Sequence, residues 1–297
     1  MSRVTSIEEL SNLKSKIETE RKFTKQVLIC GGTGCISSGS NEIADKMTEK
    51  VKAAGKENEI RVIKTGCFGF CEKGPIVKML PDNTFYTEVT PEDADRLVET
   101  HLLKEEKIEE LLFVDPVTKN KISDSDHMDF YKKQERVALR NCGVIDPENI
   151  EDYLLHDGYT ALDKVLKMSQ QEVVDIMKDS GLRGRGGGGF PTGLKWQFAL
   201  NNVSDQKYVV CNADEGDPGA FMDRSILEGD PHSVVEAMAI CGYSIGSNHG
   251  LVYIRAEYPL AVQRLIKAIE QARENGFLGK NIYGTNFDFD IEIKYGA

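Results

Sequence analysis

The sequence lacks an apolar run long enough to cross a membrane, for which about 20 consecutive residues are needed. Its longest apolar stretch, residues 234–246, is interrupted by Glu236. Positive charge is also scarce, because 37 Lys and Arg residues face 48 Asp and Glu residues, for a net charge of −11. This balance argues against nucleic acid or an anionic membrane surface as the main partner. The first residues have no signal-peptide pattern, so a cytoplasmic location is expected.

Cysteine occurs in an odd number, seven among 297 residues. A cytosolic chain of this size does not need disulfides, so clustered cysteines are better explained by metal binding or redox chemistry. Hydrophobic residues make up 40% of the chain, which is enough for real cores, and the length predicts one to three domains.

The order of the expected elements predicts an α/β protein with four parts. Residues 1–23 favour an amphipathic N-terminal helix, and residues 24–104 follow the order β-α-β-β-β-α of a thioredoxin-like domain. Residues 105–126 are polar and charged, so we expect a solvated linker there. In residues 127–297 strands alternate with helices, which predicts a Rossmann-like domain with a parallel sheet. The first helix of that domain is expected over residues 130–141.

Four of the cysteines form two pairs in loops that follow strands. Cys30 and Cys35 are separated by four residues and Cys67 and Cys71 by three, with glycines beside both pairs. All four thiols can therefore meet at one end of the sheet and bind zinc or an iron–sulfur cluster. The wide gaps and the glycines favour a [2Fe–2S] cluster, with structural zinc and with unligated or disulfide-forming cysteines as the alternatives. The other three cysteines are expected to be ordinary packing residues: Cys142, Cys211 and Cys241.

The most distinctive stretch is residues 181–196, in which six of the first nine residues are glycine. Glycine lets the backbone approach a ligand closely, and consecutive N–H groups can converge on an anion. Arg183, Arg185 and Lys195 add positive charge, and a helix-like segment follows at once. We therefore interpret the stretch as a cradle for a phosphorylated cofactor. The alternatives are a flexible linker or a tight turn.

Neither standard phosphate-binding loop fits this stretch. The spacing Gly184-x-Gly186-x-x-Gly189 matches the dinucleotide fingerprint, but it follows a helix-like segment where the fingerprint requires a strand. Leu194 interrupts the Gly-Lys pair that a Walker loop needs.

A second distinctive stretch is residues 212–219 (Asn-Ala-Asp-Glu-Gly-Asp-Pro-Gly), which follow an expected strand over residues 207–211. Sheets of α/β proteins place ligands at the C-terminal ends of their strands, so these carboxylates are site candidates. The alternative is a helix N-cap followed by a turn. Further helices are expected over residues 231–245 and 259–275. A last strand over residues 287–294 is followed at once by the end of the sequence, so we expect this domain to be truncated.

Four motifs together resemble the FMN- and NADH-binding subunit of respiratory complex I. They are the glycine loop through Trp196, residues 211–224, the turn Glu228-Gly-Asp-Pro-His232 and the segment Tyr253-Ile-Arg-Ala-Glu-Tyr258. The cysteine-bearing domain is similar to the thioredoxin-like [2Fe–2S] subunit of the same enzyme. The fusion of the two resembles the B subunit of NADH-linked, electron-bifurcating iron-only hydrogenases. Flavin subunits of NAD-dependent formate dehydrogenases and of soluble NAD-reducing hydrogenases are near neighbours.

This resemblance implies roles for individual residues. The glycine loop would lie over the flavin and the nicotinamide nucleotide, with Phe190 stacked on the adenine. Lys195 would contact the FMN, and Glu215 and Asp217 would be the acidic groups of the catalytic site, where Asp217 replaces a commoner Glu. The implied cofactor-binding residues are Gly184, Arg185, Gly186, Gly187, Gly188, Phe190, Lys195, Phe198, Asn212, Asp214, Glu215, Asp217, Glu257 and Tyr258. The implied metal ligands are Cys30, Cys35, Cys67 and Cys71.

The resemblance also implies the chemistry and the partners. It implies hydride transfer between NAD(H) and FMN, with electrons passing singly to iron–sulfur clusters, among them a [4Fe–4S] cluster in the missing C-terminal part. The acidic residues favour NAD over NADP. The implied partners are a hydrogenase catalytic subunit, a small [2Fe–2S] subunit and ferredoxin. The alternatives are the same module in a formate dehydrogenase or a respiratory enzyme, or an electron-transfer or assembly subunit without NADH activity.

Overall fold

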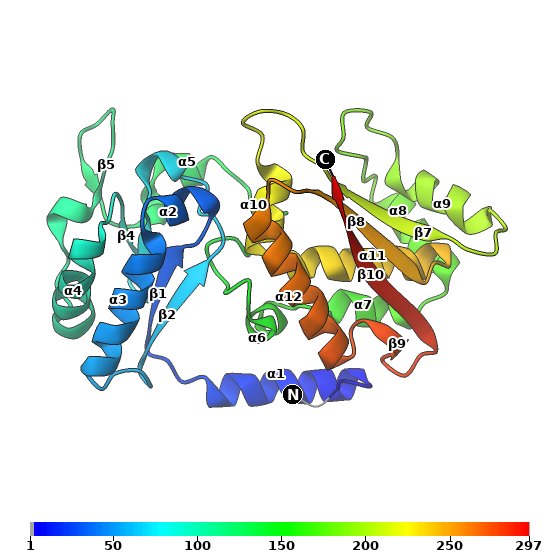
Figure 1. The fold of residues 1–297 in the computed structure, drawn as a ribbon, viewed down its shortest axis with the longest axis horizontal. Coiled ribbons are helices and arrows are strands. Elements are labelled where there is room, and N and C mark those ends of the chain that lie inside the picture. Colours follow the sequence, from blue (N-terminus) through cyan, green and yellow to red (C-terminus); the bar gives the residue numbers. More distant parts are fainter. Residues whose placement is uncertain (1–2, 297) are drawn as a thin grey trace. The chain divides into compact units, whose positions relative to one another are not determined.

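The computed structural model describes residues 3–296, which divide into two compact units (Figure 1). The first-sheet unit comprises residues 17–152 together with residues 228–230. The second-sheet unit comprises the chain up to residue 16, residues 153–227, and the chain from residue 231 onward. Three helices contribute residues to both units: α1 Ile7–Glu20, α6 Ile150–Leu155 and α10 Met222–Gly229.

The first sheet has four strands in the order β2-β1-β3-β4. Strand β1 runs parallel to β2 and antiparallel to β3, which in turn is antiparallel to β4. This is the thioredoxin-like arrangement that the sequence predicts. The strands are β1 Lys25–Cys30, β2 Ile60–Thr65, β3 Val77–Leu80 and β4 Thr84–Tyr86. The helical segments are α2 Thr33–Ser37, α3 Ser40–Ala53, η1 Cys71–Lys73, η2 Pro91–Asp93, α4 Ala94–Arg96, the π-helix η3 Leu97–Leu102, η4 Glu109–Leu111 and η5 Ser125–His127.

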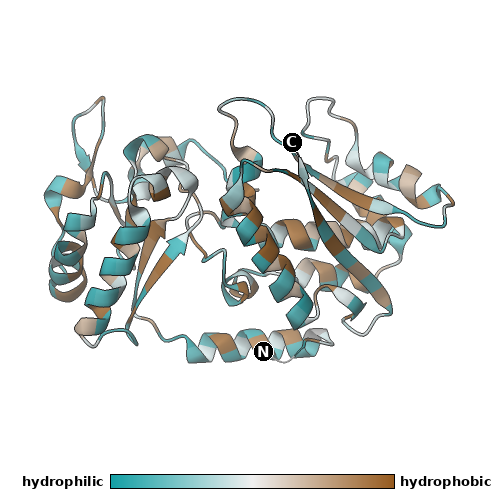
Figure 2. Ribbon diagram, viewed as in Figure 1, coloured by the Kyte–Doolittle hydropathy of each residue, from teal (hydrophilic) through white to brown (hydrophobic). Residues whose placement is uncertain are grey.

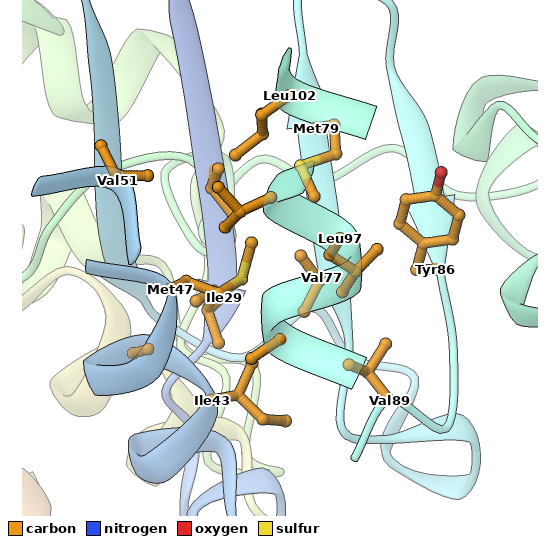
Figure 3. Close-up of a cluster of buried hydrophobic side chains, with 14 of the residues drawn as sticks. Ile29, Ile43, Met47, Val51, Val77, Met79, Tyr86, Val89, Leu97 and Leu102 are labelled. Carbon is orange, nitrogen blue, oxygen red and sulfur yellow. The ribbon is translucent and has the colours of Figure 1, made fainter. Parts of the chain in front are cut away.

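Strand β1 supplies buried side chains to both faces of this sheet, because successive strand residues point to opposite sides. Ile29 packs with Met47 of α3 and Leu97 of η3 on one face (Figure 3). Leu28 and Cys30 belong to a second buried cluster on the other face. Figure 2 shows the consequence along the chain: β1 is mostly brown, while α3 is mostly teal on the side turned to the viewer. The cysteine at the end of β1 is thus held by a packed core.

The segment expected to be a solvated linker, residues 105–126, is instead paired with the first sheet. It forms the hairpin of β5 Phe113–Val114 and β6 Lys121–Ile122. Leu112, which is buried, forms an isolated bridge with Tyr86 of β4, and Asp124 forms one with Thr84, so residues on both sides of the hairpin attach to β4. The apolar Leu-Leu-Phe-Val run inside this charged stretch explains the difference, because it needs burial.

The helix expected over residues 130–141 is wrong in its extent. Helix α5 covers only Asp129–Lys132, and turns follow it up to Cys142. In those turns Arg136 donates hydrogen bonds to the carbonyl oxygens of Phe68 at 2.8 Å and Cys142 at 3.4 Å. The guanidinium group therefore ties this segment to the loop that carries Cys67 and Cys71.

The second sheet has four strands in the order β7-β8-β10-β9. Strands β7, β8 and β10 are parallel, as the sequence predicts, and β9 is antiparallel to β10. The strands are β7 Tyr208–Ala213, β8 His249–Arg255, β9 Gly279–Ile282 and β10 Phe287–Gly296. The helices not yet given are α7 Thr160–Leu166, α8 Gln170–Asp179, α9 Thr192–Asn201, α11 Pro231–Ile245 and α12 Pro259–Asn275. None of the described helices is both long enough and apolar enough to span a bilayer.

A buried polar network joins α11 to the start of α7 in the second-sheet unit. Glu236 accepts hydrogen bonds from the Tyr153 hydroxyl at 2.5 Å and from the Tyr159 backbone N–H at 2.8 Å. His232 Nδ1 accepts from the Tyr159 hydroxyl at 2.9 Å, and its Nε2 donates to the Gln271 amide oxygen at 3.0 Å. Burial lowers the pKa of His232 to about 4, so the imidazole is neutral near pH 7, which agrees with one donor and one acceptor nitrogen.

This histidine makes the stability of the second-sheet unit depend on pH. The folded-state pKa lies below the value of about 6.5 expected in the unfolded chain, so protonation favours unfolding as the pH falls from about 6.5 towards 4. As the pH falls from 7 to 5, we expect protonation of His232 to lower the free energy of unfolding by about 2 kcal/mol. This decrease is measured by urea unfolding at both pH values, followed by the fluorescence of the single tryptophan, Trp196.

In His232→Gln the loss of stability between pH 7 and pH 5 should shrink by about that amount. His249→Gln, which changes a half-exposed histidine on β8, is the matched control and should keep the wild-type slope. Equal slopes in wild type and His232→Gln would contradict the assignment of this pH dependence to His232.

Candidate functional site

The four paired cysteines lie in two loops at one edge of the first sheet. Cys30 ends β1 and Cys35 lies in α2, while Cys67 follows β2 and Cys71 begins η1. Strands β1 and β2 are parallel, with Cys30 opposite Thr65, so both loops leave the sheet at the same edge. Parallel pairing therefore brings together thiols that are more than 30 residues apart in the sequence.

The sulfur atoms of these cysteines are close enough to share a metal cluster. The Sγ atoms of Cys67 and Cys71 are 3.6 Å apart. Two thiolates on one tetrahedral metal with bonds of about 2.3 Å lie about 3.8 Å apart, so this pair fits two ligands of one iron. The Cys30 thiol interacts with the thiols of both Cys35 and Cys67, which links the two loops. The Gly69 N–H also points at the Cys67 sulfur at 3.2 Å, a contact of the kind that tunes iron–sulfur clusters.

The acidity of these thiols reflects their mutual contacts. The hydrogen bond with Cys35 raises the pKa of Cys30 to about 12, and the same bond lowers the pKa of Cys35. The hydrogen bond with Cys30 raises the pKa of Cys67 to about 11. Because metal binding needs thiolates, loading this site releases protons.

The cysteines form no disulfide among the described residues. Within residues 3–296, no set of three or more His, Cys, Asp or Glu side chains surrounds one point as a single-ion site would require. The Cys67 and Cys71 sulfurs form one close pair, and four cysteine thiolates are the usual ligand set of a [2Fe–2S] cluster.

The glycine loop between α8 and α9 in the second-sheet unit is closed by its own backbone. The Gly184 N–H donates to the Phe190 carbonyl at 2.8 Å, and the Thr192 N–H donates to the Leu182 carbonyl at 2.9 Å. Arg183 Nε donates to the carbonyl of Gly189 at 2.6 Å. The loop is thus a hairpin-like projection, with an exposed tip formed by residues 185–188.

The tip of the loop leaves room for a ligand. A Cβ atom added at Gly186, Gly187 or Gly188 would meet no other atom within 4 Å, so these glycines are not required by packing. Gly193 has a different role, because a Cβ there would lie 2.5 Å from the backbone nitrogen of Lys178. It lets α9 start directly against the end of α8, which sets the base of the loop.

Helix α9 carries three of the implied cofactor contacts on or near its exposed side. Phe190 precedes the helix and is 51% exposed, and Phe198 within it is 63% exposed. Their ring centroids are 6.4 Å apart, so they form an aromatic pair open to solvent. Lys195 is also exposed and lies between them in sequence. The arrangement offers stacking surfaces and a positive charge beside the glycine loop.

In the acidic stretch after β7, Glu215 caps a helix, which is the alternative that the sequence left open for this stretch. The Glu215 carboxylate accepts hydrogen bonds from the backbone N–H groups of Met222 at 2.7 Å, Asp223 at 3.2 Å and Arg224 at 3.4 Å. It therefore caps the first turn of α10. This carboxylate is held in place by the fold, whereas Asp217 in the same loop is exposed.

Arg255 at the end of β8 interacts with three of the acidic candidate residues. Its guanidinium group donates to the Glu215 carbonyl at 2.7 Å and to the Glu257 carboxylate at 3.1 Å, and it lies 3.9 Å from the Asp214 carboxylate. The bond to Arg255 lowers the pKa of Glu257. Tyr258 also contacts the Glu215 carboxylate at 3.5 Å.

Arg255 was not among the site residues expected from the sequence, although it lies inside one of the four motifs. The sequence feature that could have identified Arg255 is a positive charge directly at the C-terminal end of an expected strand, next to the site candidate Glu257. The Asp214 N–H donates to the Asn212 side chain at 3.0 Å, which adds Asn212 to the same group.

The glycine loop and the acidic loop share one edge of the second sheet. In Figure 1 the green loop before α9 and the yellow loop before α10 both project from the edge where β7 and β10 end. A groove of about 430 Å³ lies instead at the opposite edge, beside the starts of the strands, where Lys207, Asn248 and Phe287 line it. The acidic candidates and Arg255 thus lie at the C-terminal ends of the parallel strands β7 and β8.

Comparison with known proteins assigns both units to described families. Residues 3–102 match the thioredoxin-like [2Fe–2S] ferredoxin family, and residues 177–297 match the family described as the Nuo51 FMN-binding domain of complex I. The chain joins a thioredoxin-like [2Fe–2S] ferredoxin domain to a complex I-type FMN-binding domain. The cysteine edge belongs to the ferredoxin domain, and the glycine and acidic loops belong to the FMN-binding domain.

Several curated relatives match about half of this chain. The chain is 70% identical over 166 residues to the NADP-reducing hydrogenase subunit HndC of Solidesulfovibrio fructosivorans, which covers 56% of this chain and 34% of that protein. It is 51% identical over 149 residues to an NADH-quinone oxidoreductase subunit of Aquifex aeolicus, covering 50% of this chain and 35% of that protein. It is 47% identical over 142 residues to the NAD-reducing hydrogenase HoxS subunit alpha of Cupriavidus necator, covering 48% and 24%. The matched part thus spans about a third or less of the length of these relatives.

Removal of one cluster ligand tests the cysteine edge. Cys67→Ala takes away a sulfur that contacts both Cys30 and Cys71, so we expect it to abolish most of the iron, about two atoms per chain in a [2Fe–2S] cluster. Iron and sulfide analysis of the anaerobically purified chain measures this. Cys241→Ala, a cysteine of the FMN-binding domain, is the control and should keep wild-type iron; equal iron in both variants would contradict the ligand set.

Proposed function

We propose that the chain is a flavin- and iron–sulfur-dependent NADH dehydrogenase subunit, which moves a hydride between NAD(H) and FMN and sends electrons singly to iron–sulfur clusters. The main support is that one chain contains both an FMN-binding domain and a [2Fe–2S] ferredoxin domain. The four thiols of the ferredoxin domain lie at one edge of its sheet. FMN supplies the conversion from a two-electron donor to one-electron acceptors. The relatives named NADH-quinone oxidoreductase and NAD-reducing hydrogenase support the same activity.

We assign the residues of this chain to binding and orientation. The exposed backbone of residues 185–188 and the charge of Lys195 are suited to phosphate groups of FMN and the nucleotide. Phe190 and Phe198 offer rings on which an adenine can stack. Asn212, Asp214, Glu257 and Tyr258 would line the flavin pocket, with Arg255 fixing their relative positions.

Glu215 and Asp217 are proposed as the acidic groups of the catalytic site. Glu215 is oriented by the amides of α10 and by Tyr258, so its carboxylate has one defined position. Asp217 is exposed and available to a nucleotide. Carboxylates near the ribose would repel a 2′-phosphate, which favours NAD over NADP. The relative HndC is named as NADP-reducing, so the preference needs a direct comparison.

We further propose that the subunit works within an electron-bifurcating hydrogenase that uses ferredoxin. Support comes from the 70% identity to a hydrogenase subunit and from the presence of the ferredoxin domain in the same chain. A hydrogenase catalytic subunit and a small [2Fe–2S] subunit would then co-purify with it. Co-purification with a formate dehydrogenase or with respiratory subunits would favour those alternatives.

The FMN contact of Lys195 is tested by Lys195→Ala. Loss of one charge-assisted contact of about 1.5–3 kcal/mol predicts FMN binding weaker by tenfold or more. The released flavin is measured by fluorescence after the purified protein is equilibrated with FMN. Lys280→Ala on β9 removes an exposed lysine from the opposite edge of the sheet and should bind FMN normally. Normal FMN binding by Lys195→Ala would contradict the assignment of Lys195 as an FMN contact.

The nucleotide preference is tested by reduction of a one-electron dye with NADH and with NADPH. We expect the rate at subsaturating nucleotide to be at least tenfold higher with NADH. Asp217→Asn removes a charge but keeps the size of the side chain. It should raise the rate with NADPH and so reduce the ratio of the NADH rate to the NADPH rate. A wild-type enzyme that prefers NADPH would contradict the role given to the carboxylates.

A further inference from the structure

Three residues that follow the acidic loop in sequence belong to the first-sheet unit. Glu228, Gly229 and Asp230 fall within the segment that matches the FMN-binding family, yet they are part of the compact unit that holds the paired cysteines. Glu228 is 2% exposed and Asp230 is 1% exposed. Two buried carboxylates are therefore present beside the loops of the ferredoxin domain.

Glu228 binds the start of the helix that carries Cys35. Its Oε2 accepts a hydrogen bond from the Thr33 backbone N–H at 3.1 Å, and its Oε1 accepts one from the Thr33 hydroxyl. Thr33 is the first residue of α2 and lies two residues before Cys35. The carboxylate thus holds one cysteine loop through two contacts, both of which need it as an acceptor.

Gly229 brings the same segment against the second cysteine loop. A Cβ atom at Gly66 would lie 2.4 Å from the Gly229 Cα, and Gly66 directly precedes Cys67. A Cβ atom at Gly229 would lie 2.5 Å from the Cys142 sulfur. Asp230 then accepts a hydrogen bond from the Asn141 amide at 2.7 Å. Residues 228–230 therefore pack against both cysteine loops, next to Thr33 in one and Gly66 in the other.

We propose that Glu228 is a positioning residue for the [2Fe–2S] cluster, which fixes the Cys35 loop and whose buried charge lowers the reduction potential of the cluster. The proposal rests on the ligand set given above. Reduction adds one negative charge to the cluster, and a nearby carboxylate in a medium of low dielectric constant opposes it. Net charge and hydrogen bonding around the sulfurs are known determinants of such potentials.

Glu228→Gln tests the charge with little change of shape. The glutamine can still accept from the Thr33 N–H, and its NH₂ group can donate to the Thr33 hydroxyl, so both contacts with Thr33 can be kept while the charge is lost. We expect the one-electron reduction equilibrium to shift about tenfold towards the reduced cluster, which is a rise of about 59 mV. An EPR-monitored redox titration of the anaerobic full chain measures it, with iron content determined in parallel.

Three further variants separate the effect of the Glu228 charge from the effect of its shape. Glu228→Asp keeps the charge and should keep a potential close to the wild type, and Glu49→Gln removes an exposed charge from α3 and should also leave it unchanged. Thr33→Val removes a donor that partly neutralises the carboxylate and should lower the potential. This last variant gives the test independently if Glu228→Gln does not fold.

The outcomes distinguish this proposal from the ligand assignment. A wild-type chain without iron would overturn the ligand set and this proposal with it. Normal iron with an unchanged potential in Glu228→Gln, or an equal rise in Glu228→Asp, would overturn the role of the Glu228 charge alone. An unchanged or higher potential in Thr33→Val would overturn it as well.

Discussion

Parallel pairing of neighbouring strands is the constraint on which both candidate sites depend. Because β1 and β2 run in the same direction, the loops with the two cysteine pairs leave the sheet at one edge. The same pairing of β7 with β8 brings the acidic loop beside Arg255. In each unit, a loss of strand register would separate groups that the sequence itself keeps far apart.

Carboxylates that accept hydrogen bonds from backbone amides hold several helix starts in this protein in place. Glu215 caps the start of α10 with three hydrogen bonds, and Glu228 in the last turn of the same helix caps α2 through Thr33. Glu236 does the same for the start of α7. A carboxylate held by backbone amides has a fixed position and a stabilised charge. Such groups can set the local field for a cofactor as well as the path of the chain.

Much of the fold could be predicted from periodicity and turn chemistry. Helices α11 and α12 have the bounds expected from the sequence, and the parallel strands and the cysteine pairs follow their expected order. The prediction failed where a local pattern was overruled by distant partners. Residues 130–141 have helical composition, but Arg136 donates a hydrogen bond to the Phe68 carbonyl of another loop. The hairpin β5–β6 lies in a charged stretch, in which a few apolar residues form the strand β5 and the flanking Leu112 bridges to β4.

The candidate site was predictable as a set of motifs but not as a network. Glycine spacing and carboxylate clustering identified the loops, whereas Arg255 and Glu228 gain their importance only from contacts across strands and loops. The proposed function requires electrons to pass from NADH through the flavin to the cluster of the same chain. The most direct measurement is the visible and EPR spectrum of the purified, anaerobic protein before and after NADH is added. We predict bleaching of the flavin band together with the EPR signal of a reduced [2Fe–2S] cluster. A protein that contains flavin and iron, yet shows neither change with NADH while dithionite produces both, would contradict it.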